Sequence, residues 1–172
     1  LMERLLNADN MTDAYASLCM LTSLDSVRFA TLRADGLAHF YDRWSHEPLV
    51  VDKWFRAQAA SSADGALDKI LALAEHPAFE RKNPNRFRSL VGVFGVGNQR
   101  HFNAADGRGY DFVASEVLAL DGLNPQTAAR VAAAFNGVGR LDPHLRGLVR
   151  DQLDRILTHG GLSRDVFEIV SR

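Results

Sequence analysis

The stretch Asn83-Pro84-Asn85-Arg86-Phe87-Arg88 places an asparagine directly before a proline. Asparagine is a favoured helix N-cap, because its side chain accepts hydrogen bonds from the first free backbone N–H groups. Proline is favoured at the first helical position, where its missing N–H leaves no hydrogen bond unmade. The same pair recurs as Asn124-Pro125, and Asp142-Pro143 joins another capping residue to a proline. These three pairs predict helix starts in the second half of the chain.

Glycines and a capping serine mark the other helix boundaries in this half. Gly95-Val96-Gly97-Asn98 ends one helix, and Asp106-Gly107-Arg108-Gly109 precedes the next, from about Tyr110 to Asp121. Gly160-Gly161 ends a later helix, and Ser163 caps a last short one. Both signals are typical of helix termini, because glycine accepts the left-handed conformation and serine caps free N–H groups.

Apolar residues at helical spacing predict four more helices in the first half. Asn10 stands before Met11-Thr12-Asp13 as an N-cap. Gly36 lies inside a predicted helix and is expected to weaken it by about 1 kcal/mol relative to alanine. Ser61-Ser62 is expected to end one helix and cap the next. The predicted helices span about residues 11–24, 26–44, 49–60 and 63–75, with the tail of another over residues 2–6.

The fold class that follows is all-α. No window alternates cleanly at period two with β-branched residues, so no strand is predicted. Eight or nine helices with short turns favour a superhelical stack of helical hairpins, an α-solenoid of the armadillo or HEAT type. The sequence has no linker, low-complexity tract or long charge run, so residues 1–172 are expected to form a single domain.

Composition excludes several classes of function. The 172 residues carry 20 Lys+Arg against 21 Asp+Glu, a net charge of -1. No global basic field is therefore present to hold nucleic acid or an anionic membrane. The single cysteine, Cys19, excludes an internal disulfide and a cysteine-based zinc cluster. No apolar run reaches the roughly 18 residues of a membrane span, and no signal peptide is evident. A cytoplasmic location is expected, and the start on Leu1 favours a piece of a longer protein.

Catalytic motifs are absent. His46-Glu47 begins the H-E-x-x-H pattern of zinc hydrolases, but Val50 stands where the second histidine ligand must be. The glycines at 92, 95 and 97 have neither the Walker nor the dinucleotide-binding spacing, so helix termination explains them better. No G-x-S-x-G elbow occurs, and the six histidines are scattered along the chain.

One cluster points to binding. Arg86 and Arg88 lie near the start of a predicted helix, where the helix dipole does not favour cations. Either they form ion pairs with a neighbouring helix, or they offer a cationic patch to a carboxylate such as a peptide terminus. Asp106-Gly107-Arg108-Gly109-Tyr110 is a second polar loop, for which a tight glycine turn is the simpler interpretation. Asp52-Lys53-Trp54-Phe55 is interpreted as aromatic core packing with the charges outward.

Six short motifs in order make the chain resemble a known family, the C-terminal domain of bacterial aminopeptidase N, a zinc-dependent alanyl aminopeptidase of the gluzincin type. The resemblance extends from about Asn10 to the end of the chain. The motifs are Asn10-Met11-Thr12-Asp13, Asp52-Lys53-Trp54-Phe55, Asn83-Pro84-Asn85-Arg86-Phe87-Arg88-Ser89-Leu90, Phe102-Asn103, Asp106-Gly107-Arg108-Gly109-Tyr110, and Asn124-Pro125-Gln126 through Ala129-Arg130.

The resemblance implies an armadillo-like superhelix that packs over a thermolysin-like catalytic domain and closes the active site into an internal cavity. It implies that the zinc ligands and the general-base glutamate lie upstream, so that zinc belongs to the parent enzyme and none is bound by this chain. The implied partners are that catalytic domain of the same polypeptide and peptide substrates. The chain alone is expected to be inactive.

By motif position, the resemblance also implies that Arg88 and Arg130 line the cavity toward the carboxyl side of the substrate, with Arg86 a weaker candidate. The accessory domain would limit access to the active site. An alternative from a different class is a free-standing α-solenoid that presents a concave surface to a partner protein.

Overall fold

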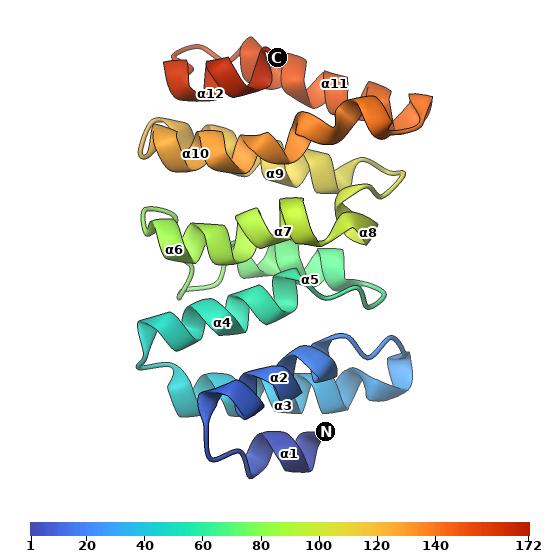
Figure 1. Ribbon diagram of the computed structural model, residues 1–172, viewed down its shortest axis with the longest axis vertical. Helices are drawn as coiled ribbons and strands as arrows, with labels where there is room; N and C mark the ends of the chain where they lie inside the picture. Colours follow the sequence, from blue (N-terminus) through green and yellow to red (C-terminus); the bar gives the residue numbers. More distant parts are fainter. The chain divides into compact units, whose positions relative to one another are not determined.

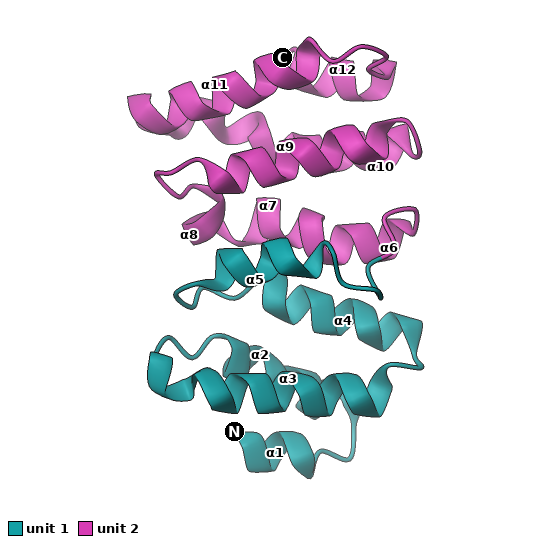
Figure 2. Cartoon of the chain, turned by 180° about the vertical axis from the view of Figure 1, so that it is seen from behind, with its two compact units in different colours: residues 1–79 teal, residues 80–172 magenta.

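The computed structural model describes all residues from 1 to 172, and every regular element in it is helical. The all-α prediction is therefore confirmed. Backbone contacts group the chain into two compact units, residues 1–79 and 80–172 (Figure 2). That residues 1–172 act as one domain stays a prediction.

Unit 1 is built from five α-helices and one turn of 3₁₀ helix. α2 packs against α1, α3 and α4, and α4 packs against α5 (Figure 1). Asn10 caps α2 as expected, since its side-chain oxygen accepts a 2.9 Å hydrogen bond from the N–H of Asp13. The elements are α1 (Met2–Leu6), α2 (Met11–Thr22), η1 (Val27–Phe29), α3 (Ala30–Trp44), α4 (Pro48–Ala59) and α5 (Ala66–Leu73).

Gly36 has a packing role that its low helix propensity hides. A β-carbon built on it would lie 2.9 Å from Cδ1 of Leu21 and 3.4 Å from Cδ2 of Leu5. Because a contact under 3.0 Å would force the Leu21 side chain to shift, the glycine lets α3 approach α2 and α1 closely without that rearrangement. The weakening of the helix is thus accepted for tighter packing.

Rings fill the centre of unit 1. Trp54 and Phe55 lie edge to face at 5.1 Å, and His76 contacts both rings at 5.2 and 5.9 Å. The Trp54 indole N–H donates to the carbonyl of Leu37, which satisfies its only donor. The interpretation of residues 52–55 as core packing is confirmed, with Lys53 over the Tyr15 ring at 5.2 Å.

Unit 2 contains seven α-helices, a π-helical turn and a 3₁₀ segment. α9 packs against α8, α10 and α11, and α10 packs against α12 (Figure 1). The elements are α6 (Pro84–Phe87), η2 (Arg88–Gly92, π-helical), α7 (Val93–Gly97), α8 (Gln99–Phe102), α9 (Arg108–Asp121), α10 (Pro125–Ala132), η3 (Ala133–Arg140, 3₁₀), α11 (Pro143–Leu157) and α12 (Arg164–Val170).

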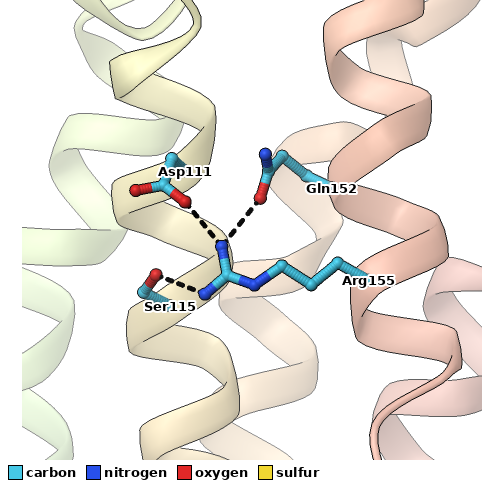
Figure 3. A network of polar contacts seen from close by, with 4 residues as sticks. All are labelled: Asp111, Ser115, Gln152 and Arg155. Carbon is cyan, nitrogen blue, oxygen red and sulfur yellow. Dashed lines mark hydrogen bonds and ion pairs between the residues drawn. The ribbon is translucent and has the colours of Figure 1, made fainter.

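Polar side chains join helices across unit 2. Arg155 of α11 donates to Asp111 and Ser115 of α9 at 2.5 and 2.7 Å, and to Gln152 of its own helix at 2.9 Å (Figure 3). Buried Asp121, at the end of α9, accepts from the backbone and hydroxyl of Ser163 and so fixes the start of α12.

The expected number of helices, eight or nine, is too low, since twelve α-helices are present. The region after Pro84 accounts for part of the difference, because a π-helical turn divides it into α6 and α7. The helix expected from Ala63 begins at Ala66, because Gly65 has a φ of 71° and interrupts it. The helix expected from about Tyr110 begins two residues earlier, at Arg108.

Candidate functional site

The arginine-bearing segment begins at a well-formed helix cap. The side-chain oxygen of Asn83 accepts hydrogen bonds from the backbone N–H of Asn85 at 3.0 Å and of Arg86 at 3.3 Å. Pro84 occupies the first helical position. The predicted cap is therefore confirmed, and it fixes the direction in which α6 leaves the preceding loop.

A bidentate ion pair anchors that preceding loop. Arg81 donates through Nε and Nη2 to the two carboxylate oxygens of Glu116, at 2.9 and 3.0 Å. The Glu116 side chain is 9% exposed and that of Arg81 33%. Because Glu116 lies on α9, the pair holds the chain just ahead of α6 against the middle of unit 2.

The three arginines proposed from sequence have different environments. Arg86 is only 7% exposed, so its charge lies inside unit 2. Arg88 and Arg130 are exposed. Of the three, the structure therefore leaves Arg88 and Arg130 accessible to a ligand, and burial favours a structural role for Arg86.

Arg88 is the first residue of the π-helical turn η2. Its Nε donates to the carbonyl of Pro84 at 3.0 Å, and its Nη2 donates to the side-chain oxygen of Asn85 at 2.6 Å. π-Helical turns are rare and are frequently found at functional sites. The π-helical turn is therefore an indication of a functional site in this segment that does not depend on the charge of Arg88.

Arg130 lies in the last turn of α10, which begins at the predicted Asn124-Pro125 pair. The Asn124 side chain accepts from the N–H of Thr127 at 3.0 Å, so this cap is confirmed. α10 packs against η2: a β-carbon on Gly92 would lie 3.7 Å from Val131 and 3.5 Å from Cβ of Arg88. The structure thus brings together the two elements that carry the exposed arginines.

The second polar loop, residues 106–110, is a tight glycine turn, as the simpler interpretation of the sequence predicted. Gly107 has a φ of 73°, and Asp106 accepts from the N–H of Arg108 at 3.1 Å. A β-carbon on Gly109 would lie 2.5 Å from the carbonyl oxygen of His101. The Tyr110 hydroxyl donates to Asn103 at 2.8 Å, and burial raises the pKa of Tyr110. The residues of this motif therefore hold α8 against α9.

The remaining reactive side chains do not meet the requirements of a metal site. No set of three or more His, Cys, Asp or Glu side chains is placed to hold a metal ion. Cys19 is half-buried beside Tyr15, and burial raises the pKa of its thiol. What unit 2 can offer a ligand is positive charge in a fixed geometry, which suits a carboxylate. Separately, none of the helices combines the length and apolar character that a membrane crossing requires.

Sequence reasoning missed two features of this site. The Asn85–Arg88 contact follows from an i, i+3 spacing on a helix, a signal that was present in the sequence. The π-helical turn over Arg88–Gly92 has no local signal of this kind in the sequence.

Comparisons with known proteins agree with this architecture. A family model described as "Domain of unknown function (DUF3458_C) ARM repeats" matches residues 1–172. Aminopeptidase N of Caulobacter vibrioides is 41% identical over 165 residues, and that of Haemophilus influenzae is 38% identical over 166 residues. Each match covers 96% of this chain and 19% of the relative, so the chain spans about a fifth of the length of these relatives.

A solved structure has the same fold. Aminopeptidase A of Legionella pneumophila, in complex with aspartic acid, superposes with a TM-score of 0.89 at 26% sequence identity. The match covers 98% of this chain and 19% of that one.

Proposed function

The chain belongs to the DUF3458_C family of ARM-repeat domains and matches the C-terminal part of aminopeptidase N-like proteins. From this premise we propose that it is the accessory domain of a zinc-dependent aminopeptidase N. The parent enzyme would remove N-terminal residues from peptides in the cytoplasm. This domain would cap the active-site cavity, limit substrate access and have no activity alone.

The observation that carries the proposal is the environment of Arg88. The side chain is exposed, its hydrogen-bond partners are a backbone carbonyl and a neutral amide, and its element packs against the one that carries Arg130. Positive charge that no carboxylate neutralises is suited to the carboxyl end of a peptide. Arg88 and Arg130 would therefore act on the product side of the cavity.

Zinc enters the proposal only through the parent enzyme, where it would polarise the scissile carbonyl and activate water. The residues of this chain do not fit a zinc site, since no suitable group of ligands is present. The part proposed for this chain is to exclude bulk water from the cavity and to orient the peptide by its carboxylate.

The test is Arg88→Ala in the full-length enzyme that carries this chain. KM for a tripeptide with a free carboxylate should rise about tenfold, equal to about 1.4 kcal/mol of lost binding. Hydrolysis of alanyl-p-nitroanilide, which has no carboxylate, should be nearly unchanged. Arg164→Ala is the control, because Arg164 is an exposed arginine already paired with Glu168. Equal losses on both substrates would refute a product-side role.

The chain alone offers a second test of the accessory role. The purified 172 residues should bind no zinc and release no p-nitroaniline from alanyl-p-nitroanilide. Stoichiometric zinc with chelator-sensitive turnover would contradict the proposal.

A further inference from the structure

The guanidinium of Arg88 is held along one edge. The N–H of Nε and one N–H of Nη2 lie on the same edge of the planar guanidinium, and they donate to the Pro84 carbonyl and the Asn85 amide oxygen. Both hydrogens of Nη1 and the second hydrogen of Nη2 remain. The end of the fork, between Nη1 and Nη2, is therefore the edge that can grip a carboxylate with two parallel hydrogen bonds.

Arg81 shows what the same edge does when its partner is charged. Its Nε and Nη2 both donate to the carboxylate of Glu116, at 2.9 and 3.0 Å. The Glu116 carboxylate neutralises the charge of Arg81 and occupies the Nε–Nη2 edge of its guanidinium, so this pair serves as a structural link. Arg88 has the same edge occupied by two neutral acceptors, so its orientation is fixed while its charge is kept.

Asn85 is itself fixed in place. Its backbone N–H donates to the cap residue Asn83 at 3.0 Å, so its position follows from the start of α6. Both Asn85 and Arg88 are exposed. A hydrogen bond between two exposed side chains contributes little to folding, because water competes for both partners. Its main consequence is the direction of the guanidinium.

We infer that Asn85 is a positioning residue, which holds the Arg88 guanidinium so that its Nη1–Nη2 end receives a peptide carboxylate. This inference rests on the proposed function, because it requires that Arg88 meets that carboxylate. Asparagine suits the role because it accepts a hydrogen bond without adding a negative charge.

The experiment compares Asn85→Ala, Asn85→Asp and Arg88→Ala in the full-length enzyme. The substrates are a tripeptide with a free carboxylate and the same tripeptide with a C-terminal amide. Asn85→Asp should raise KM for the free carboxylate about as much as Arg88→Ala, roughly tenfold, because the new carboxylate occupies and neutralises Arg88. Asn85→Ala should raise KM for the free carboxylate about threefold, because the Arg88 guanidinium then loses one of the two hydrogen bonds that fix its orientation. The kcat values, and KM for the amide, should stay within about twofold.

The control is Asn136→Asp, which adds the same charge at an exposed asparagine of η3. It should leave both substrates unaffected, and all variants should melt close to the parent enzyme. If Arg88→Ala changes nothing, the proposed function fails. If Arg88→Ala weakens the free carboxylate while Asn85→Ala does not, positioning by Asn85 is wrong. If Asn85→Asp is the only Asn85 variant that raises KM for the free carboxylate, positioning by Asn85 is also wrong. The added negative charge would then explain the weaker binding without any change in the orientation of Arg88.

Discussion

The two units offer contrasting examples of hydrogen bonds that join helices. In unit 1, side chains donate to backbone carbonyls of other elements: Thr22 to Ala57, Ser61 to Thr22, and Trp54 to Leu37. In unit 2, several links join two side chains from different elements. The pairs are Arg81 with Glu116, Arg155 with Asp111 and Ser115, and Ser163 with Asp121.

This difference has a physical consequence. A carbonyl acceptor is present whatever residue stands at that position, so the links of unit 1 depend on one side chain each. The side-chain pairs of unit 2 need two matching residues, and most of them include a charged carboxylate. These links are therefore set by particular residue pairs, and unit 2 is also the part that carries Arg88 and Arg130.

The largest effect is expected from a methyl group at Gly109 of unit 2. The β-carbon of Gly109→Ala would lie 2.5 and 2.6 Å from the carbonyl oxygens of His101 and Phe102, which are backbone atoms that cannot turn aside. The free energy of unfolding should fall by about 3 kcal/mol or more in urea denaturation.

The matched change in unit 1 is Gly36→Ala. Its β-carbon would meet the ends of the Leu21 and Leu5 side chains, which can change rotamer. The gain in helix propensity, about 1 kcal/mol, offsets much of the cost, so the net loss should be below about 1 kcal/mol. Similar losses at both glycines would contradict the packing at Gly109.

A smaller loss is expected from Glu116→Ala. It removes the Glu116 carboxylate that pairs with Arg81, and breaking a buried pair costs about 3–5 kcal/mol. Because Arg81 is one-third exposed and can turn to water, we expect about 2 kcal/mol. Ser61→Ala in unit 1 loses the neutral hydrogen bonds that its hydroxyl donates to the Thr22 carbonyl and accepts from the N–H of Ala63, and it should cost about 1 kcal/mol. A larger loss at Ser61 than at Glu116 would reverse the contrast.

Much of the fold could be predicted because helix caps are local. The capping side chains of Asn10, Asn83, Asn124, Asp142 and Ser163 all accept the expected backbone hydrogen bonds. Each cap depends on residues within three positions, so the sequence window contains all the information needed. Two of the misplaced starts, at Ala66 and Arg108, follow glycines with positive φ instead of capping side chains, and the helix expected from Ser26 begins at Ala30 after the 3₁₀ turn η1.

The candidate site was harder to predict, because burial is not local. Arg86 and Arg88 are two positions apart, and one is buried while the other is exposed. Which of them faces water depends on the π-helical turn that begins at Arg88 and on its packing against α10. The neutral partners of Arg88, on which the proposed role of Asn85 depends, likewise follow from the three-dimensional fold.

The third prediction concerns alkaline pH and unit 1. Burial, with Cys19 as the neighbouring group, raises the pKa of Tyr15 from 10.0 to about 12. The folded chain therefore favours the protonated phenol. Its contribution to stability is complete below about pH 10 and is lost as the pH rises toward 12. Tyr15→Phe should reduce the fall in melting temperature between pH 9 and 11. An equal fall in both proteins would show that Tyr15 ionises as freely when folded as when unfolded.

The smallest effect is expected from the exposed network around Arg155 (Figure 3). The Arg155 and Asp111 side chains are 41% and 62% exposed, so water and salt screen their attraction. A double-mutant cycle with Arg155→Ala and Asp111→Ala isolates this pair from the bonds that Arg155 makes to Ser115 and Gln152. The coupling energy should be about 0.5 kcal/mol and should fall further in 1 M salt.

This result would sharpen the contrast between the units. If surface pairs contribute so little, the specificity of unit 2 lies in its buried pair, Arg81 with Glu116, and the exposed pairs add only orientation. A coupling of about 2 kcal/mol that persists in salt would instead place Arg155 beside Arg81 as a main link of unit 2. The Arg81–Glu116 and Arg155–Asp111 pairs would then contribute about equally to the stability of unit 2. In that case Glu116→Ala should lower the free energy of unfolding by less than the burial of the Glu116 side chain predicts.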